Sequence, residues 1–123
     1  MNHLRIYESI IANAKLENRE KLAKTSENYV YYENHHIIPR CVGGGEEKEN
    51  KVLLTAKEHF VCHKLLIYIY PKSRGLALAL RRFLYSRKNG MTFSSKDYAF
   101  VKNAISLIPV GDKYCGHSYP WGT

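Results

Sequence analysis

The stretch 29–70 constrains the fold of this chain most, because strand, loop and helix signals follow one another there in a fixed order. Residues 29–38 (YVYYENHHII) are rich in aromatic and β-branched side chains, which favours a strand. Residues 39–50 contain a proline and three successive glycines, which is typical of a loop. Residues 51–55 (KVLLT) suit a second, short strand.

A helix is expected directly after this second strand. Thr55 and Glu58 have the S/T-x-x-E spacing of a capping box, in which each side chain satisfies a free backbone N–H at the start of a helix. The helix should cover residues 56–70 and stop before Pro71, because proline breaks a helix interior. The sequence therefore predicts one strand–loop–strand–helix unit near the centre of the chain.

The flanks, 3–17 and 73–108, are predicted to be helical. Three segments carry apolar side chains at helical spacing: residues 3–17, residues 74–88 after a cap at Ser73, and residues 96–108 after a cap at Ser94 or Ser95. Asn89 with Gly90, and then Pro109, are expected to end the last two helices. A polar connector is expected over 17–28, and the aperiodic tail 109–123 is expected to be loose. At 123 residues, we expect one mostly helical α+β domain.

The charge of the chain favours an anionic partner. Lys and Arg outnumber Asp and Glu by 19 to 11, which gives a formal charge of +8 and a pI near 9.4. Nucleic acid is the first candidate and a membrane surface the second. No apolar run is long enough to span a membrane, and the N-terminus does not resemble a signal peptide. Three widely spaced cysteines do not form a disulfide framework, so we expect a cytoplasmic protein.

Four of the six histidines lie between residues 33 and 66. His59 and His63 are four apart on the expected helix, so both rings lie on one face and can converge on one ion. His35 and His36 are adjacent in a strand and should point to opposite faces. One of them can face the ion while the other stands free as a general base, since a neutral imidazole suits that task at cellular pH. A three-histidine site leaves a coordination position open, as catalytic metal sites do.

Two other interpretations of these histidines remain open at this point. The His59–His63 pair can arise by chance, and the rings can be core side chains with satisfied hydrogen bonds. A closed structural zinc site that uses Cys41 with the histidines is the second alternative, and it would make the chain a non-catalytic, zinc-stabilised DNA-binding module. Cys62 is an unlikely ligand, because it lies well around the helix from His63, and packing suits it better.

The motifs HHIIP, GG, Asn50 and EHFVCH resemble, over about residues 30–70, the HNH endonucleases of the ββα-metal (His-Me) finger superfamily. The sequence around these motifs resembles small phage-encoded HNH homing endonucleases. The resemblance implies that His36 is the general base and that Asn50 orients the loop that carries it. It also implies that His35 and His59 are metal ligands, and that His63 is the additional ligand seen in the colicin-like branch.

The activity implied by this resemblance is metal-dependent hydrolysis of phosphodiester bonds in double-stranded DNA, which leaves 5′-phosphate and 3′-hydroxyl ends. One divalent ion is expected, with Mg, Mn, Zn and Ni as candidates. Arg40, and Arg81 with Arg82 on the 74–88 helix, are candidate phosphate contacts. A lone loop arginine such as Arg40 is more often simply solvated, and a solvated polar face explains Arg81 and Arg82 equally well. A further hypothesis is that the chain is an RNase or a toxin that acts on another nucleic acid.

Overall fold

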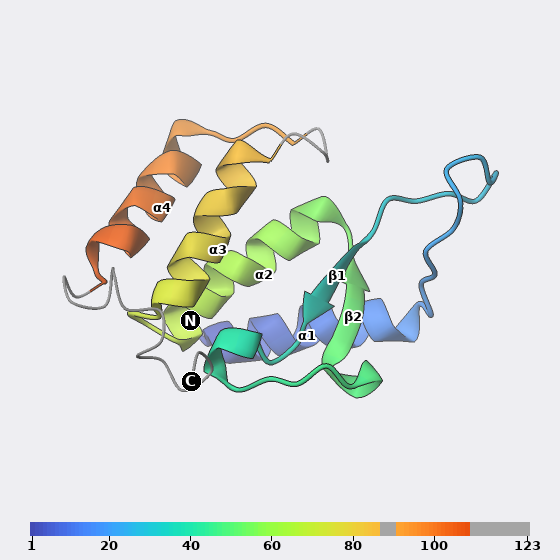
Figure 1. Cartoon of the computed structure of the whole chain (residues 1–123), viewed down its shortest axis with the longest axis horizontal. Coiled ribbons are helices and arrows are strands. Elements are labelled where there is room, and N and C mark those ends of the chain that lie inside the picture. Colours follow the sequence, from blue (N-terminus) through green and yellow to red (C-terminus); the bar gives the residue numbers. More distant parts are fainter. Residues whose placement is uncertain (87–90, 109–123) are drawn as a thin grey trace.

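The computed structural model describes residues 1–86 and 91–108 and confirms a mostly helical α+β fold (Figure 1). Its elements in chain order are α1 (His3–Leu16), β1 (Glu33–His36), β2 (Lys51–Leu54), α2 (Ala56–Ile69), α3 (Arg74–Tyr85) and α4 (Ser95–Ser106). Two short 3-10 turns, Arg40–Val42 and Lys48–Asn50, lie in the loop between the strands. The predicted strand–loop–strand–helix unit is therefore present, with α1 on one side of α2 and α3 on the other.

The sheet consists of β1 and β2, paired antiparallel, with His35 opposite Val52 and His36 opposite Lys51. β1 is shorter than the strand predicted over 29–38, because β2 pairs with only four of these residues. The aromatic residues before Glu33 have no strand beside them among the described residues, so composition alone does not make them a strand.

The helix α2 begins as its sequence predicts. The Thr55 hydroxyl accepts from the Glu58 backbone N–H at 3.2 Å, and the Glu58 carboxylate accepts from the Thr55 N–H at 2.9 Å, so both halves of the capping box are formed. The helix buries one face against α1 and the sheet, where Cys62 and Leu66 are fully buried in the main apolar core. Cys62 is thus a packing residue, as its position around the helix indicated.

A second apolar cluster joins α2, α3 and α4 through Phe60, Leu80, Leu84 and Val101. Ser73 and Ser94 cap α3 and α4 with side-chain hydrogen bonds, as predicted. The helix predicted over 74–88 ends earlier, at Tyr85 with Ser86 as its C-cap. The predicted stops at Asn89 and Gly90 and at Pro109, and the tail 109–123, lie outside the described residues.

No helix in the described part of the chain is long and apolar enough to cross a membrane. The connector that leaves α1 extends away from the helices and returns to β1 (Figure 1). Arg19 anchors its beginning, because the side chain is only 8% exposed and its guanidinium donates to both carboxylate oxygens of Glu58, at 2.6 and 3.1 Å. It also donates to the Leu53 carbonyl at 3.0 Å, so one side chain joins the connector to β2 and to the start of α2.

The Arg19–Glu58 pair predicts a pH-dependent stability. The hydrogen bonds from Arg19 hold the pKa of Glu58 below its ordinary value. The ionised carboxylate therefore contributes stability above the pKa of the unfolded chain, about 4.3, and this contribution is lost as the pH falls through the lower folded-state pKa. We expect Glu58→Gln, which keeps the capping box but removes the charge, to lower the free energy of unfolding near pH 7 and to differ progressively less from wild type as the solution is acidified. Urea unfolding curves at several pH values measure this, and a difference that stays constant with pH would contradict it.

Candidate active site

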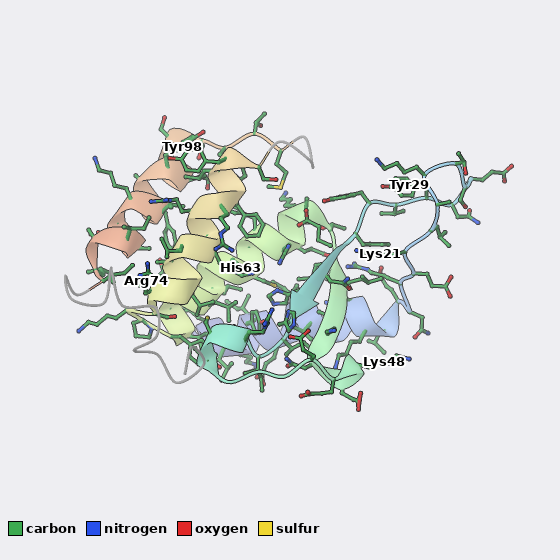
Figure 2. The ribbon with its side chains drawn as sticks, in the orientation of Figure 1. Lys21, Tyr29, Lys48, His63, Arg74 and Tyr98 are labelled. Atoms are coloured by element: carbon green, nitrogen blue, oxygen red, sulfur yellow. The ribbon has the colours of Figure 1, made fainter. Side chains whose placement is uncertain are left out.

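Three of the four clustered histidines converge. His35 comes from the buried face of β1, and His59 and His63 come from successive turns of α2. One ring nitrogen from each can be chosen such that all three lie within 4.8 Å of one another. The ring centroids are 4.9 to 5.2 Å apart, and the rings are steeply inclined to one another. Figure 2 marks His63 on α2, beside the sheet. The geometry is that of three imidazoles arranged around one ion-sized space.

A hydrogen bond from α1 determines the tautomer of His35, whose side chain is buried. The Tyr7 hydroxyl lies 2.6 Å from His35 Nε2 and donates its single proton to the Ile37 carbonyl at 2.7 Å. Since that proton is already used, the hydroxyl must accept from His35, and Nε2 carries the ring hydrogen. The lone pair of His35 is therefore on Nδ1.

A carboxylate determines the tautomer of His59. His59 Nδ1 lies 2.7 Å from Glu33 Oε1, and an ionised carboxylate can only accept, so Nδ1 donates and Nε2 keeps the lone pair. The other carboxylate oxygen of Glu33 accepts from the Tyr31 hydroxyl at 2.6 Å. Such partners fix the orientation of a ligating histidine and raise the basicity of its free nitrogen.

All three rings are suited to be ligands, because burial keeps them neutral. Burial, with the neighbouring His63 and His59, lowers the pKa of His35 to about 2. Burial, with His59, lowers the pKa of His63 to about 3, and burial also lowers the pKa of His59 despite the opposing effect of Glu33. His63 Nδ1 is buried and has no hydrogen-bond partner among the described residues. A metal ion would satisfy such unpaired nitrogens, so the donor set fits a divalent cation.

His36 points to the other face of β1, as the strand alternation predicted, but it is not free. Its Nε2 lies 2.9 Å from Glu46 Oε2. The same carboxylate group is 3.2 Å from Arg40 Nε and 3.4 Å from Lys51 Nζ. The expectation of an unengaged ring was wrong, because the loop between the strands brings Glu46 back to the end of β1. As a donor to the carboxylate, Nε2 carries the hydrogen, and the Nδ1 of the neutral ring keeps its lone pair.

Asn50 holds the loop that follows His36. Its side chain is 7% exposed. It accepts from the Ile38 N–H at 2.8 Å and donates to the carbonyls of Ile38, at 3.0 Å, and Gly45, at 2.9 Å. Gly44 allows the loop to pass close to the backbone of Ile38, because a Cβ at Gly44 would lie 1.7 Å from the Ile38 carbonyl oxygen. The Asn50 contacts join the two ends of the loop segment between Ile38 and Gly45.

The histidines open onto a cavity of about 600 Å³, the histidine cavity, which is lined by all four of them. Arg40, Arg74 and Arg82 line it as well, so the cavity carries positive charge beside the cluster. Of the arginines predicted from sequence, Arg40 and Arg82 thus lie at the cavity, whereas Arg81 is not among its described lining residues. The Arg40 side chain is 72% exposed and is paired with Glu46.

Sequence reasoning did not assign Tyr7, Glu33, Glu46 or Arg74 to the site. Glu33 carried a usable signal, since it lies two residues before His35, on the same expected strand. Tyr7 and Glu46 carried none, because one comes from a separate helix and the other from a loop whose path only the folded chain shows.

The fold and the site together define a small α+β protein with a cationic cavity and a three-histidine, metal-ligand-like cluster. No family model matches the sequence, and no solved structure is significantly similar to it. Curated relatives do exist in Enterobacteria phage T4. "Probable mobile endonuclease E" is 49% identical over 113 residues, which are 90% of this chain and 74% of that protein. "Probable mobile endonuclease B" is 43% identical over 106 residues, and "Probable mobile endonuclease D" is 39% identical over 112.

The chain therefore belongs to the family of these probable mobile endonucleases of phage T4. It spans 38% of the length of endonuclease B and 42% of the length of endonuclease D.

Removal of the Asn50 side chain should loosen the loop between the strands. Asn50→Ala removes three part-buried hydrogen bonds, to the N–H and carbonyl of Ile38 and to the carbonyl of Gly45, each worth about 0.5–1.5 kcal/mol. We expect the free energy of unfolding to fall by about 2 kcal/mol or more, with faster amide exchange at Ile38. Asn103→Ala, at an exposed position of α4, is the matched control and should change little. Unchanged unfolding and exchange in Asn50→Ala would contradict the bracing role.

Proposed function

We propose that this chain is a metal-dependent endonuclease of the HNH type, which hydrolyses phosphodiester bonds of double-stranded DNA in the phage-infected cell. The observation that carries the proposal is the combination of three converging neutral histidines on one face of β1 and α2 with His36 on the other face of β1, at the same cavity. The names of the phage relatives support an endonuclease.

His35, His59 and His63 would hold one divalent ion. When bound, the ion supplies Lewis-acid stabilisation of the negative charge that develops on the phosphate and on the leaving oxygen. A set of three imidazoles favours zinc, nickel, cobalt or manganese over magnesium, which prefers oxygen ligands. Tyr7 and Glu33 orient two of the rings, so that the nitrogens with lone pairs are His35 Nδ1 and His59 Nε2.

His36 would act as the general base. Glu46 holds the ring through its Nε2 hydrogen, and Nδ1 takes a proton from a water molecule. The water oxygen bonds to phosphorus as the bond from phosphorus to the 3′ oxygen breaks, and a proton from solvent completes the 3′-hydroxyl group. Asn50 positions the loop after His36, so that the base keeps its place.

Arginines would hold the phosphates near the reacting bond. Arg82 lines the histidine cavity from α3, and Arg40 lies beside Glu46. Arg81 is exposed on the same helix as Arg82, and its position suits a phosphate farther along the backbone. Arg74 also lines the cavity and joins this set.

The structure favours this reading over a zinc-stabilised DNA-binding module. Among the described residues, the metal-ligand cluster consists of the three histidines and does not include Cys41. A three-ligand set with an open position is the arrangement of a catalytic ion.

His36→Ala should abolish cleavage without removing the metal site. General-base catalysis is worth about 10²–10⁴-fold, so we expect nicking of supercoiled plasmid with Mn²⁺ to slow by at least about 100-fold. Co²⁺ binding should be retained, because His36 is not one of the three converging rings. His3→Ala is the control, since His3 stacks on Tyr68, away from the cluster. A folded, metal-loaded wild type that leaves plasmid intact would overturn the proposed function.

Glu33→Gln should weaken metal binding and spare the fold. Loss of a carboxylate partner of a ligating histidine typically costs about 10- to 100-fold in metal affinity. We expect a loss of this size in Co²⁺ titrations followed by visible absorption, and a greater loss for His63→Ala. Glu27→Gln removes a charge from the exposed connector and should bind Co²⁺ like wild type. Equal Co²⁺ affinities in Glu33→Gln and Glu27→Gln would show that Glu33 does not support the metal site. Unfolding of the protein when a chelator removes the metal would favour the hypothesis of a structural zinc site.

A further inference from the structure

A second cavity, of about 640 Å³, is lined by residues of α1, the connector and both strands, and by none of the four clustered histidines. We call it the lysine cavity, because its described lining includes Lys15, Lys21, Lys48 and Lys51. These lysines come from the end of α1, the connector, the Lys48–Asn50 turn and β2. Lysines from three separate parts of the sequence thus line one hollow of the surface.

The lysine cavity carries a clear excess of positive charge. Arg19 also lines it, but this guanidinium is neutralised by Glu58 and Glu17. Glu46 is the one acidic residue among the described residues that line either this cavity or the histidine cavity. Lys21 and Lys48 are exposed, so their charges face solvent. A hollow lined in this way attracts a polyanion more strongly than a flat surface with the same charge.

The two cavities are neighbours on the surface. Asn34 lines both of them. Glu46, at the boundary, contacts His36 and Arg40 on one side and Lys51 on the other. Figure 2 places Arg74 on one side of His63 along the long axis of the molecule, and Lys21 and Lys48 on the other. Arginines therefore lie on one side of the histidines and lysines on the other, with Glu46 between the two groups.

We propose that the lysine cavity binds the phosphate backbone of duplex DNA on one side of the bond that is cleaved. This inference rests on the proposed function, since it takes the histidine cavity as the place of the reacting phosphate. A duplex presents phosphates at regular intervals along a line, which suits cations that lie on both sides of the histidines. The contacts are to phosphates, so they position the DNA and do not read its sequence.

The test is the salt dependence of DNA binding by the metal-free protein, which cannot cleave by the proposed mechanism. The variant Lys21→Ala/Lys48→Ala is compared with Lys96→Ala/Lys102→Ala, which removes the same charge from exposed positions on α4. Fluorescence anisotropy with a labelled duplex of arbitrary sequence, over a series of KCl concentrations, gives the slope of log K against log [salt]. Each lost phosphate contact lowers the magnitude of this slope by about 0.9, so we expect a decrease of about 2 for the first pair and little change for the second.

Equal slopes for wild type and Lys21→Ala/Lys48→Ala would overturn the inference, and so would equal losses in both pairs, which would indicate a general effect of charge. A weaker slope in the first pair alone supports it. Plasmid nicking by the wild type separates this result from the proposed function. If the wild type nicks plasmid but the slopes are unchanged, the proposed nuclease function stands and DNA binding by the lysine cavity is rejected. If binding depends on the lysines but the wild type does not nick plasmid, the DNA-binding surface stands and the proposed nuclease function is rejected.

Discussion

The burial of His35 is the constraint on which the rest of this structure depends. A polar ring that is only 2% exposed needs hydrogen-bond partners, because an unsatisfied polar group in the interior is costly. Tyr7 supplies one and is itself held by the Ile37 carbonyl, so α1 is tied to the end of β1. The same ring faces His59 and His63, which ties β1 to α2. One buried side chain thus sets the relative positions of three elements, and its tautomer follows from the same contacts.

Neutral and charged groups are separated around this point. The three converging rings are kept neutral by burial, and three arginines line the same cavity. This arrangement suits a metal cation at the histidines, because neutral rings do not repel it. It also suits a polyanion near the arginines, because their positive charges attract it. Glu46 is the exception at the boundary, where it holds His36, Arg40 and Lys51 together. The hydrogen bond from His36 keeps the pKa of this carboxyl below its ordinary range.

Local signals predicted the helices well, because their causes are local. The capping boxes at Thr55 and Ser94 and the cap at Ser73 involve residues three apart, and the structure forms all of them. The strand predicted over 29–38 was too long, because a strand exists only where a second one pairs with it, and β2 offers four residues. The helix predicted over 74–88 was too long for a related reason. Among the described residues of this helix the last buried one is Leu84, and the helix ends one residue later, at Tyr85.

The sequence by itself determined the spacing of the four histidines: one helical turn between His59 and His63, and opposite strand faces for His35 and His36. These relations follow from the periods of a helix and a strand, which any stretch of the chain obeys. Only the tertiary structure decided that Tyr7, Glu33 and Glu46 would be the partners of these rings, and that lysines from three separate parts of the sequence would line one hollow beside them. The reason is that such contacts join residues far apart in the chain or across a loop, and no periodicity encodes which distant groups the folded core brings together.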